Sequence, residues 1–274
     1  MLLNITPSGN EFQRKMLLEH SSKIRKIFIV VLFLLPLAVF IGNHYAKPNE
    51  DVVENNYMRN VAKIVAINGE DYTTGNIEKS QGTAFLLSDQ SGITTGYLFT
   101  ARHVIAESES KKVRLEFPYI STEDGEPLIT TASIVWTTDV AFDGRDVNTL
   151  RYDVALLKLD DLSVLPEDVS GFMIGTEMQI KKKISIYGFP KDEGYAQDGQ
   201  IANTSYKGIE DLFILSFDID SGLSGAPIYD ESTGEVLGIA IAKANNADLQ
   251  RICISLKRAL ELMDQAGIKG LLSE

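Results

Sequence analysis

The chain has 274 residues, of which 44% are hydrophobic, and carries 26 Lys and Arg against 38 Asp and Glu, a formal net charge of −12. The hydrophobic fraction excludes a disordered or collagen-like chain, and the acidic balance argues against a nucleic-acid groove, which needs clustered Lys and Arg opposite the phosphates. The single cysteine, Cys253, excludes an intrachain disulfide and a multi-cysteine zinc site.

The charge is distributed unevenly along the N-terminal part of the chain. Residues 1–26 carry five Lys or Arg against two Glu, a net charge of +3, whereas residues 27–46 carry no Lys, Arg, Asp or Glu. Residues 27–41 are continuously apolar (IFIVVLFLLPLAVFI). A bilayer core takes about 20 residues of helix, and the residues that follow the apolar run extend it toward the interface. We predict that residues 27–46 form one N-terminal transmembrane helix.

Three interpretations of this segment compete: an uncleaved signal anchor, a cleaved secretory signal peptide and a buried soluble helix. The sequence His44-Tyr45-Ala46 places a bulky His where signal cleavage prefers small residues, and the 26-residue leader is long for a signal peptide. A buried helix that is apolar all round would need a large surrounding core. We therefore favour a signal anchor. The excess of Lys and Arg before the segment places the N-terminus in the cytoplasm and the acidic body outside it, as a single-pass cell membrane protein.

The remainder of the chain reads as a polar linker, residues 47–58, followed by a domain of short strands, residues 59–274. Twelve apolar, often alternating runs are separated by Gly, Asp, Asn and Ser. They form two groups of six, at about residues 59–160 and 178–255. Because almost no helix intervenes, we predict an all-β protein made of sandwiches or closed barrels.

The C-terminal residues 256–266 predict a closing amphipathic helix. Leu256, Leu260 and Met263 recur at helical spacing, and Gly267 is a natural stop.

Three residues of this domain are candidates for chemistry. His103 is the only histidine outside the N-terminal segments, and it follows a predicted strand. Ser224 lies within GLSGAP, where Gly222 and Gly225 permit a tight turn that exposes the hydroxyl and aims the N–H groups of Gly222 and Ser224 at one point. Asp153 precedes an apolar strand, where it can accept a hydrogen bond from an imidazole. Taken singly, each also fits a surface histidine, an ordinary loop or a capping carboxylate.

Together, these residues and their flanks resemble a known family. In chain order the chain contains GTAFLL, TARHV, YDVALLKL, ISIYGFP, GLSGAP, GEVLGIAIA and ISLKRALELM. This series is similar to the trypsin and chymotrypsin-like serine peptidases, especially their bacterial, disulfide-free HtrA-type branch, over about residues 60–266. The resemblance implies two six-stranded β-barrels with a catalytic triad of His103, Asp153 and Ser224 in the cleft between them. It also implies an oxyanion hole formed by Gly222 and Ser224.

Some positions depart from the family pattern. Leu223 replaces an Asp that precedes the serine in many animal relatives, Ala226 stands where Gly is usual, and Val104 replaces a vertebrate Cys. No residues remain after the predicted helix for a PDZ domain, which HtrA-type proteins usually carry, so we expect none in this chain. Asp218, six residues before Ser224, occupies the offset of the acid that gives trypsin-like members a Lys or Arg preference, whereas HtrA-type relatives generally prefer small aliphatic residues.

The sequence thus predicts a membrane-anchored serine endopeptidase that hydrolyses protein or peptide substrates through an acyl-enzyme. The alternative is a catalytically idle trypsin-like module that binds or senses a partner. We expect the reaction to need no metal or organic cofactor, and we expect no nucleic-acid partner.

Overall fold

The computed structural model describes residues 57–66, 81–106, 108, 111–141, 146–190, 193–241 and 251–268. The predicted leader, the predicted transmembrane segment 27–46 and most of the predicted linker lie outside these residues. Within the part that is described, no helix combines the length and hydropathy needed to cross a bilayer.

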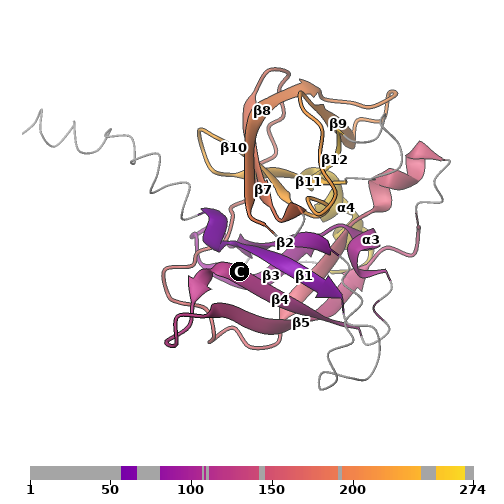
Figure 1. Ribbon diagram of the computed structural model, residues 1–274. Helices are drawn as coiled ribbons and strands as arrows, with labels where there is room; N and C mark the ends of the chain where they lie inside the picture. The colour runs from indigo at the N-terminus through magenta and orange to yellow at the C-terminus, as the bar shows by residue number, and fades with distance from the viewer. Residues whose placement is uncertain are drawn as a thin grey trace, which may run out of the picture. The chain divides into compact units, whose positions relative to one another are not determined.

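The first six strands form a closed antiparallel barrel, shown in violet to magenta in Figure 1, in the order β1-β2-β3-β6-β5-β4. The barrel closes where β1 pairs with β4. Its strands are β1 (Val61–Ala66), β2 (Gln81–Ser88), β3 (Thr94–Thr100), β4 (Lys112–Ser121), β5 (Pro127–Thr137) and β6 (Ala155–Leu159).

The other six strands form a second closed barrel, in the order β10-β11-β12-β9-β8-β7, which closes where β10 pairs with β7. Its strands are β7 (Lys183–Gly188), β8 (Tyr195–Asn203), β9 (Leu212–Leu215), β10 (Pro227–Asp230), β11 (Val236–Ala240) and β12 (Ile252–Ser255). The prediction of two barrels of six strands each is confirmed.

Strand alternation creates three apolar cores. In β2, Ala84 and Leu86 point into the first barrel, whereas Phe85 between them faces outward. Phe85 and Phe99 of the neighbouring strand β3 belong to a cluster that the first barrel shares with the second. In β12, Cys253 points into the second barrel. Because successive strand residues point to opposite faces, a strand that is buried on both faces is apolar throughout. The shared cluster holds the two barrels together.

The predicted closing helix is α4 (Leu256–Gln265). It begins at Ser255, whose hydroxyl accepts a hydrogen bond from the N–H of Arg258. It ends before Gly267, which has a φ of +79°, the left-handed conformation that glycine adopts without strain. Leu256, Ala259, Leu262 and Met263 bury one face of α4 in the cluster shared by the barrels.

Two short helical segments were not expected from the strand pattern. They are α3 (Arg102–Ile105), after β3, and the 3-10 helix η1 (Val147–Tyr152), before β6. α3 contains His103 and η1 ends just before Asp153, so each determines how its candidate side chain is presented.

Candidate active site

His103 is carried by α3. Its neighbours Val104 and Ile105 are buried in the core of the first barrel, whereas His103 stays partly exposed. Close packing of α3 on β2 requires glycine at position 82, because a Cβ there would lie 2.3 Å from a methyl carbon of Val104. The glycine that opens the GTAFLL motif therefore positions the histidine helix.

Asp153 caps the C-terminal end of η1. Its N–H donates to the carbonyl oxygen of Leu150, and its side chain is only 3% exposed. The flanking residues Leu150 and Val154 are buried in the cluster between the barrels. The carboxylate thus enters the site from a well-anchored segment, as expected for a buried residue just before a strand.

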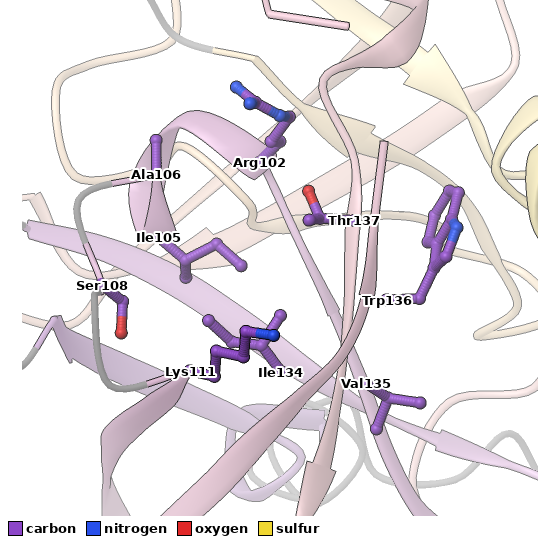
Figure 2. A pocket seen from close by; sticks show the side chains of 9 residues that line it. All are labelled: Arg102, Ile105, Ala106, Ser108, Lys111, Ile134, Val135, Trp136 and Thr137. Atoms are coloured by element: carbon purple, nitrogen blue, oxygen red, sulfur yellow. The ribbon is translucent and has the colours of Figure 1, made fainter. Parts of the chain in front are cut away.

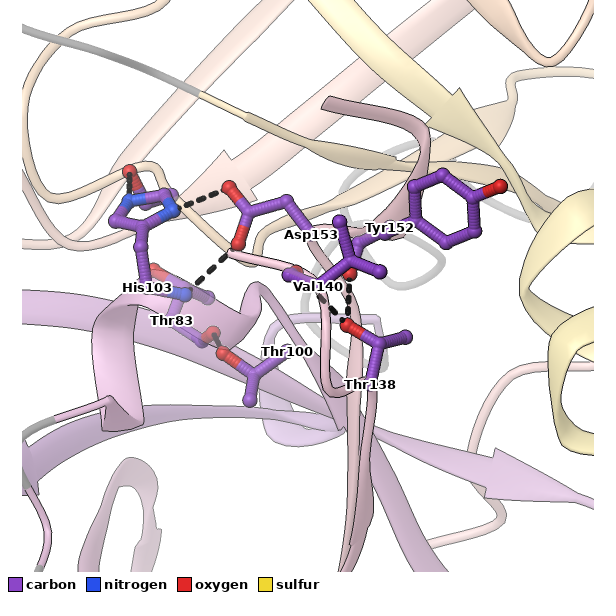
Figure 3. A network of polar contacts seen from close by, with 8 residues as sticks. Thr83, Thr100, His103, Thr138, Val140, Tyr152 and Asp153 are labelled. Atoms are coloured by element: carbon purple, nitrogen blue, oxygen red, sulfur yellow. Dashed lines mark hydrogen bonds and ion pairs between the residues drawn. The ribbon is translucent and has the colours of Figure 1, made fainter. Parts of the chain in front are cut away.

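The structure brings the three candidates into one hydrogen-bonded series. Nδ1 of His103 lies 2.6 Å from Oδ2 of Asp153, and Nε2 lies 2.9 Å from Oγ of Ser224. The backbone N–H of His103 also donates to Oδ1 of Asp153 at 2.8 Å, as Figure 3 shows. Both carboxylate oxygens therefore bind the same histidine, one through its ring and one through its backbone, and this fixes the orientation of the imidazole.

Ser224 lies in two consecutive tight turns. The N–H of Leu223 donates to the carbonyl oxygen of Asp220, and the N–H of Ala226 donates to that of Leu223. In each turn the third residue is a glycine with positive φ, +98° at Gly222 and +86° at Gly225. A positive φ at this position is the requirement of a type II turn. The GLSGAP motif thus makes the tight turn that its glycines predict.

A support network, which the sequence did not reveal, lies beneath His103 and Asp153. The hydroxyl of Thr138 donates to the carbonyl oxygen of Tyr152 at 2.5 Å (Figure 3). Nε of Arg102 donates to the carbonyl oxygen of Thr138 at 2.9 Å. Arg102 adjoins His103 and Tyr152 adjoins Asp153. No sequence signal marks this role, because Thr138 and Arg102 meet only when the barrel closes.

Asp218, the acidic residue six positions before Ser224, lies apart from the hydrogen-bonded series of the three candidates. Asp218 is 55% exposed and forms an ion pair with Arg251, whose Nε lies 2.5 Å from its Oδ1. Asp218 is thus a half-exposed carboxylate that pairs with a cation of the same chain, and not an unpaired acid in a buried pocket.

A separate hollow of about 390 Å³ lies beside α3. Figure 2 shows Ile105, Lys111 and Ile134 near one another among the lining residues, with Arg102 and Thr137 higher in the view. Its lining includes neither His103 nor Ser224, so it is distinct from the triad. Among the described residues, no group of three or more His, Cys, Asp or Glu side chains could hold a metal ion.

Two closed barrels joined by a buried cluster, with an Asp–His–Ser series at their junction, define the architecture of a chymotrypsin-like serine peptidase. The family model of the trypsin-like peptidase domain matches residues 82–239, more than half of the chain. The chain belongs to the trypsin-like peptidase family, and it is a serine endopeptidase. A search of curated proteins found no match.

Solved structures with the same fold include several proteases. One is Deg5, with a TM-score of 0.52 and 17% identity over 78% of this chain and 93% of that one. A second is the HtrA-type protease AlgW with a decapeptide, with a TM-score of 0.54 and 19% identity over 81% of this chain and 68% of that one. A third is Rv3671c from M. tuberculosis H37Rv in an inactive form, with a TM-score of 0.52 and 18% identity over 82% of this chain and 96% of that one. At these identities the likeness concerns the fold.

Proposed function

We propose that the peptidase acts through Ser224 as nucleophile, His103 as general base and acid, and Asp153 as the residue that orients the imidazole. The observation that carries this assignment is the unbroken series of short contacts from Asp153 through His103 to the hydroxyl of Ser224. The backbone N–H groups of Gly222 and Ser224 complete the site as its oxyanion hole.

In the acylation step, Oγ of Ser224 bonds to the carbonyl carbon of the scissile peptide while its proton passes to Nε2 of His103. The carbonyl electron pair moves onto oxygen, where the N–H groups of Gly222 and Ser224 stabilise it. Asp153 stabilises the imidazolium. When the intermediate collapses, the C–N bond breaks, the leaving amine takes the proton from Nε2, and an ester remains on Ser224.

Deacylation repeats these steps with water. His103 removes a proton from a water molecule, the resulting bond to the acyl carbon forms a second oxyanion, and Oγ of Ser224 leaves with the proton held by Nε2. The acid product departs and the free hydroxyl is restored. No redox partner is involved, because both half-reactions exchange only protons and an acyl group.

Labelling with a fluorophosphonate probe, combined with hydrolysis of an unfolded protein, tests this assignment. We expect the wild type to be labelled and Ser224→Ala and His103→Ala to lose hydrolysis, while Asp153→Asn lowers turnover by up to about 10⁴-fold because the wrong tautomer becomes accessible. Ser170→Ala, which changes an exposed serine, is the matched control. A folded wild type that neither labels nor hydrolyses would instead favour the idle binding module.

We further propose that residues 27–46 anchor the peptidase in the cell membrane, with residues 1–26 in the cytoplasm and the peptidase domain outside it. Support comes from the apolar run and from the excess of Lys and Arg that precedes it. Residues 47–56 separate the segment from Tyr57, the first described residue, and even fully extended they span only about 35 Å. The anchored enzyme would thus meet substrates close to the membrane surface.

Protease accessibility in spheroplasts and the mass of the mature protein test the anchor. We expect externally added protease to reach the peptidase domain and the mature protein to retain residues 27–46. A mature N-terminus near Lys47 would show that the segment is a cleaved signal peptide.

A further inference from the structure

Thr83, on β2 of the first barrel, uses all of its polar groups at the junction with the second barrel. It is fully buried. Its hydroxyl donates to the carbonyl oxygen of Gly222 at 2.9 Å and accepts from the N–H of Phe189 at 3.3 Å. Its backbone N–H donates to the carbonyl oxygen of Ser224 at 2.8 Å, and its own carbonyl oxygen accepts from the hydroxyl of Thr100 at 2.7 Å.

Three of these four hydrogen bonds hold segments of the second barrel at the serine loop. The hydroxyl holds the carbonyl group that follows the N–H of Gly222, and the backbone N–H holds the carbonyl group that follows the N–H of Ser224. Peptide planes are rigid, so only the φ and ψ rotations of Gly222 or Ser224 itself lie between the held carbonyl group and the N–H group of the same residue, and holding the carbonyl group restricts these rotations. The contacts of Thr83 therefore bear on both N–H groups of the proposed oxyanion hole.

In family members with an acidic residue before the serine, a newly freed N-terminal ammonium group pairs with that residue and orders the oxyanion loop, and this chain cannot form that ion pair. Leu223 occupies the position of their acidic residue and is fully buried in the core of the second barrel. An apolar side chain gives no ion pair to an incoming ammonium group. The loop is instead held by hydrogen bonds, some within its own turns and the second barrel, and those from Thr83 reach the backbone of Gly222 and Ser224 from the first barrel.

We propose that Thr83 is a positioning residue that holds the oxyanion loop in its active conformation from across the barrel junction. This inference rests on the proposed function, because it assigns the loop to the oxyanion hole. The hydroxyl is required specifically, since it is at once a donor to Gly222 and an acceptor from Phe189. Val has nearly the same shape as Thr but would leave the buried carbonyl oxygen of Gly222 and the buried N–H of Phe189 without this hydrogen-bond partner. Leaving a buried polar group unpaired costs more free energy than its hydrogen bond contributes.

Kinetics on a peptide substrate test the role with three variants. For Thr83→Val we expect kcat to fall about 10- to 100-fold with KM within twofold, because the oxyanion forms only after substrate binds. The affinity for a peptide aldehyde, whose adduct also forms an oxyanion, should fall by a similar factor. Thr83→Ser retains the hydroxyl and should recover kcat to within about threefold. Thr95→Val is the control, because it removes a hydroxyl hydrogen bond, to the carbonyl oxygen of Leu87, within the same barrel.

The outcomes separate this inference from the assignment of the triad. If the wild type shows serine-dependent labelling but Thr83→Val keeps the wild-type kcat and aldehyde affinity, the role of Thr83 is refuted and the triad stands. A Thr83→Ser variant as slow as Thr83→Val, with both melting at the wild-type temperature, also refutes it.

If Thr83→Val melts far below Thr95→Val, the comparison of Thr83→Ser with the wild type provides the test. In that case, a Ser variant that melts normally but has a kcat more than tenfold lower contradicts the proposal. A wild type without serine-dependent labelling contradicts the proposed function itself.

Discussion

At the scale of single residues, the glycines around Ser224 leave no room for a side chain. A Cβ at Gly225 would lie 2.1 Å from the carbonyl oxygen of Thr83, and one at Gly222 would lie 2.5 Å from that of Phe189. These obstacles are backbone atoms, which cannot rotate aside. The serine loop therefore depends on glycine both for its positive φ angles and for its close approach to the neighbouring segments.

This steric limit gives the first prediction. Gly225→Ala should lower the free energy of unfolding by more than about 2 kcal/mol and abolish most activity, since the loop must move to relieve the clash. Gly208→Ala is a matched control, because Gly208 also has a positive φ, +78°, but nothing lies near its potential Cβ. We expect it to cost only about 1 kcal/mol and to leave turnover unchanged. Equal losses in the two variants, measured by urea unfolding, would contradict the steric explanation.

Asp230 is a buried carboxylate outside the site. Its burial raises its pKa, but hydrogen bonds from Lys182 and Ser232 lower it more, so the net pKa lies below the ordinary value. Oδ2 lies 2.7 Å from Nζ of Lys182, which is 20% exposed. A carboxyl group whose pKa is lower in the folded state stabilises the fold above its unfolded pKa of about 3.9, and this stabilisation is lost as the pH falls through the folded pKa.

Lys182→Met should therefore destabilise the protein by about 3 kcal/mol at pH 7, the lower end for a buried pair, because Lys182 is partly exposed. The difference from the wild type should shrink as the pH is lowered from 5 to 2, since protonated Asp230 no longer needs a cation. Urea unfolding across this pH range measures both effects. Lys183→Met, at an exposed position, is the control. A difference that stayed constant with pH would exclude Asp230 as its source.

At the scale of secondary-structure elements, α4 contacts η1, the segment that presents Asp153. Arg258 of α4 is almost fully buried, and its guanidinium lies 5.2 Å from the ring centroid of Tyr152, the last residue of η1. Its Nε is 3.4 Å from Asp211, which also pairs with Arg151 of η1. The C-terminal helix thus contributes a cation–π contact and shared ion pairs to the segment that carries the carboxylate.

Arg258→Met should lower the free energy of unfolding by about 1 to 2 kcal/mol, because Met replaces the packing volume but neither the cation–π contact nor the ion pairs. Lys257→Met on the exposed face of α4 should change it by less than about 0.5 kcal/mol. Thermal melting of the two variants provides the measurement. If the Lys257 variant lost as much stability as the Arg258 variant, the loss would be due to the helix propensity of the substituted residue and not to the contacts of Arg258.

At the scale of the whole molecule, the arrangement of the serine loop bears on activation. Leu223 is buried and Thr83 supplies hydrogen bonds to the loop, so the loop has a source of order that is independent of any newly formed N-terminus. At the other end of the domain, the ring of Tyr57 stacks on Phe172, with centroids 5.6 Å apart, and lies 5.1 Å from the ring of Tyr229.

Chains that begin at Lys47 or at Glu54 should therefore be equally active without any further cleavage. A chain that begins at Asn60 should be less stable, because it loses the aromatic contacts of Tyr57, yet its activity should still be present below its melting temperature. Peptide hydrolysis and melting of the three purified proteins would be compared. If only one of the three chains were active, the serine loop would depend on a particular N-terminus, which contradicts this prediction.

The sequence by itself determined the twelve strands, the C-terminal helix and the three candidates for catalysis. Alternation of apolar with polar residues marks strands because successive side chains point to opposite faces. The spacing of Leu256, Leu260 and Met263 marks a helix because residues three or four apart lie on the same helix face. The turn around Ser224 was also predictable, because positive φ angles favour glycine at Gly222 and Gly225. Such patterns depend on neighbours in the chain.

Only the tertiary structure decided which distant groups meet. Asp218 pairs with Arg251, 33 positions later, so the sequence offset that suggested an acidic specificity pocket does not describe its environment. Thr83 reaches Gly222, 139 positions away, only because two barrels close and then pack against each other. Hydrogen bonds and ion pairs form only between groups about 3 Å apart. Closure of a barrel brings residues that are distant in sequence to this separation, and their positions in the sequence do not indicate that they will meet.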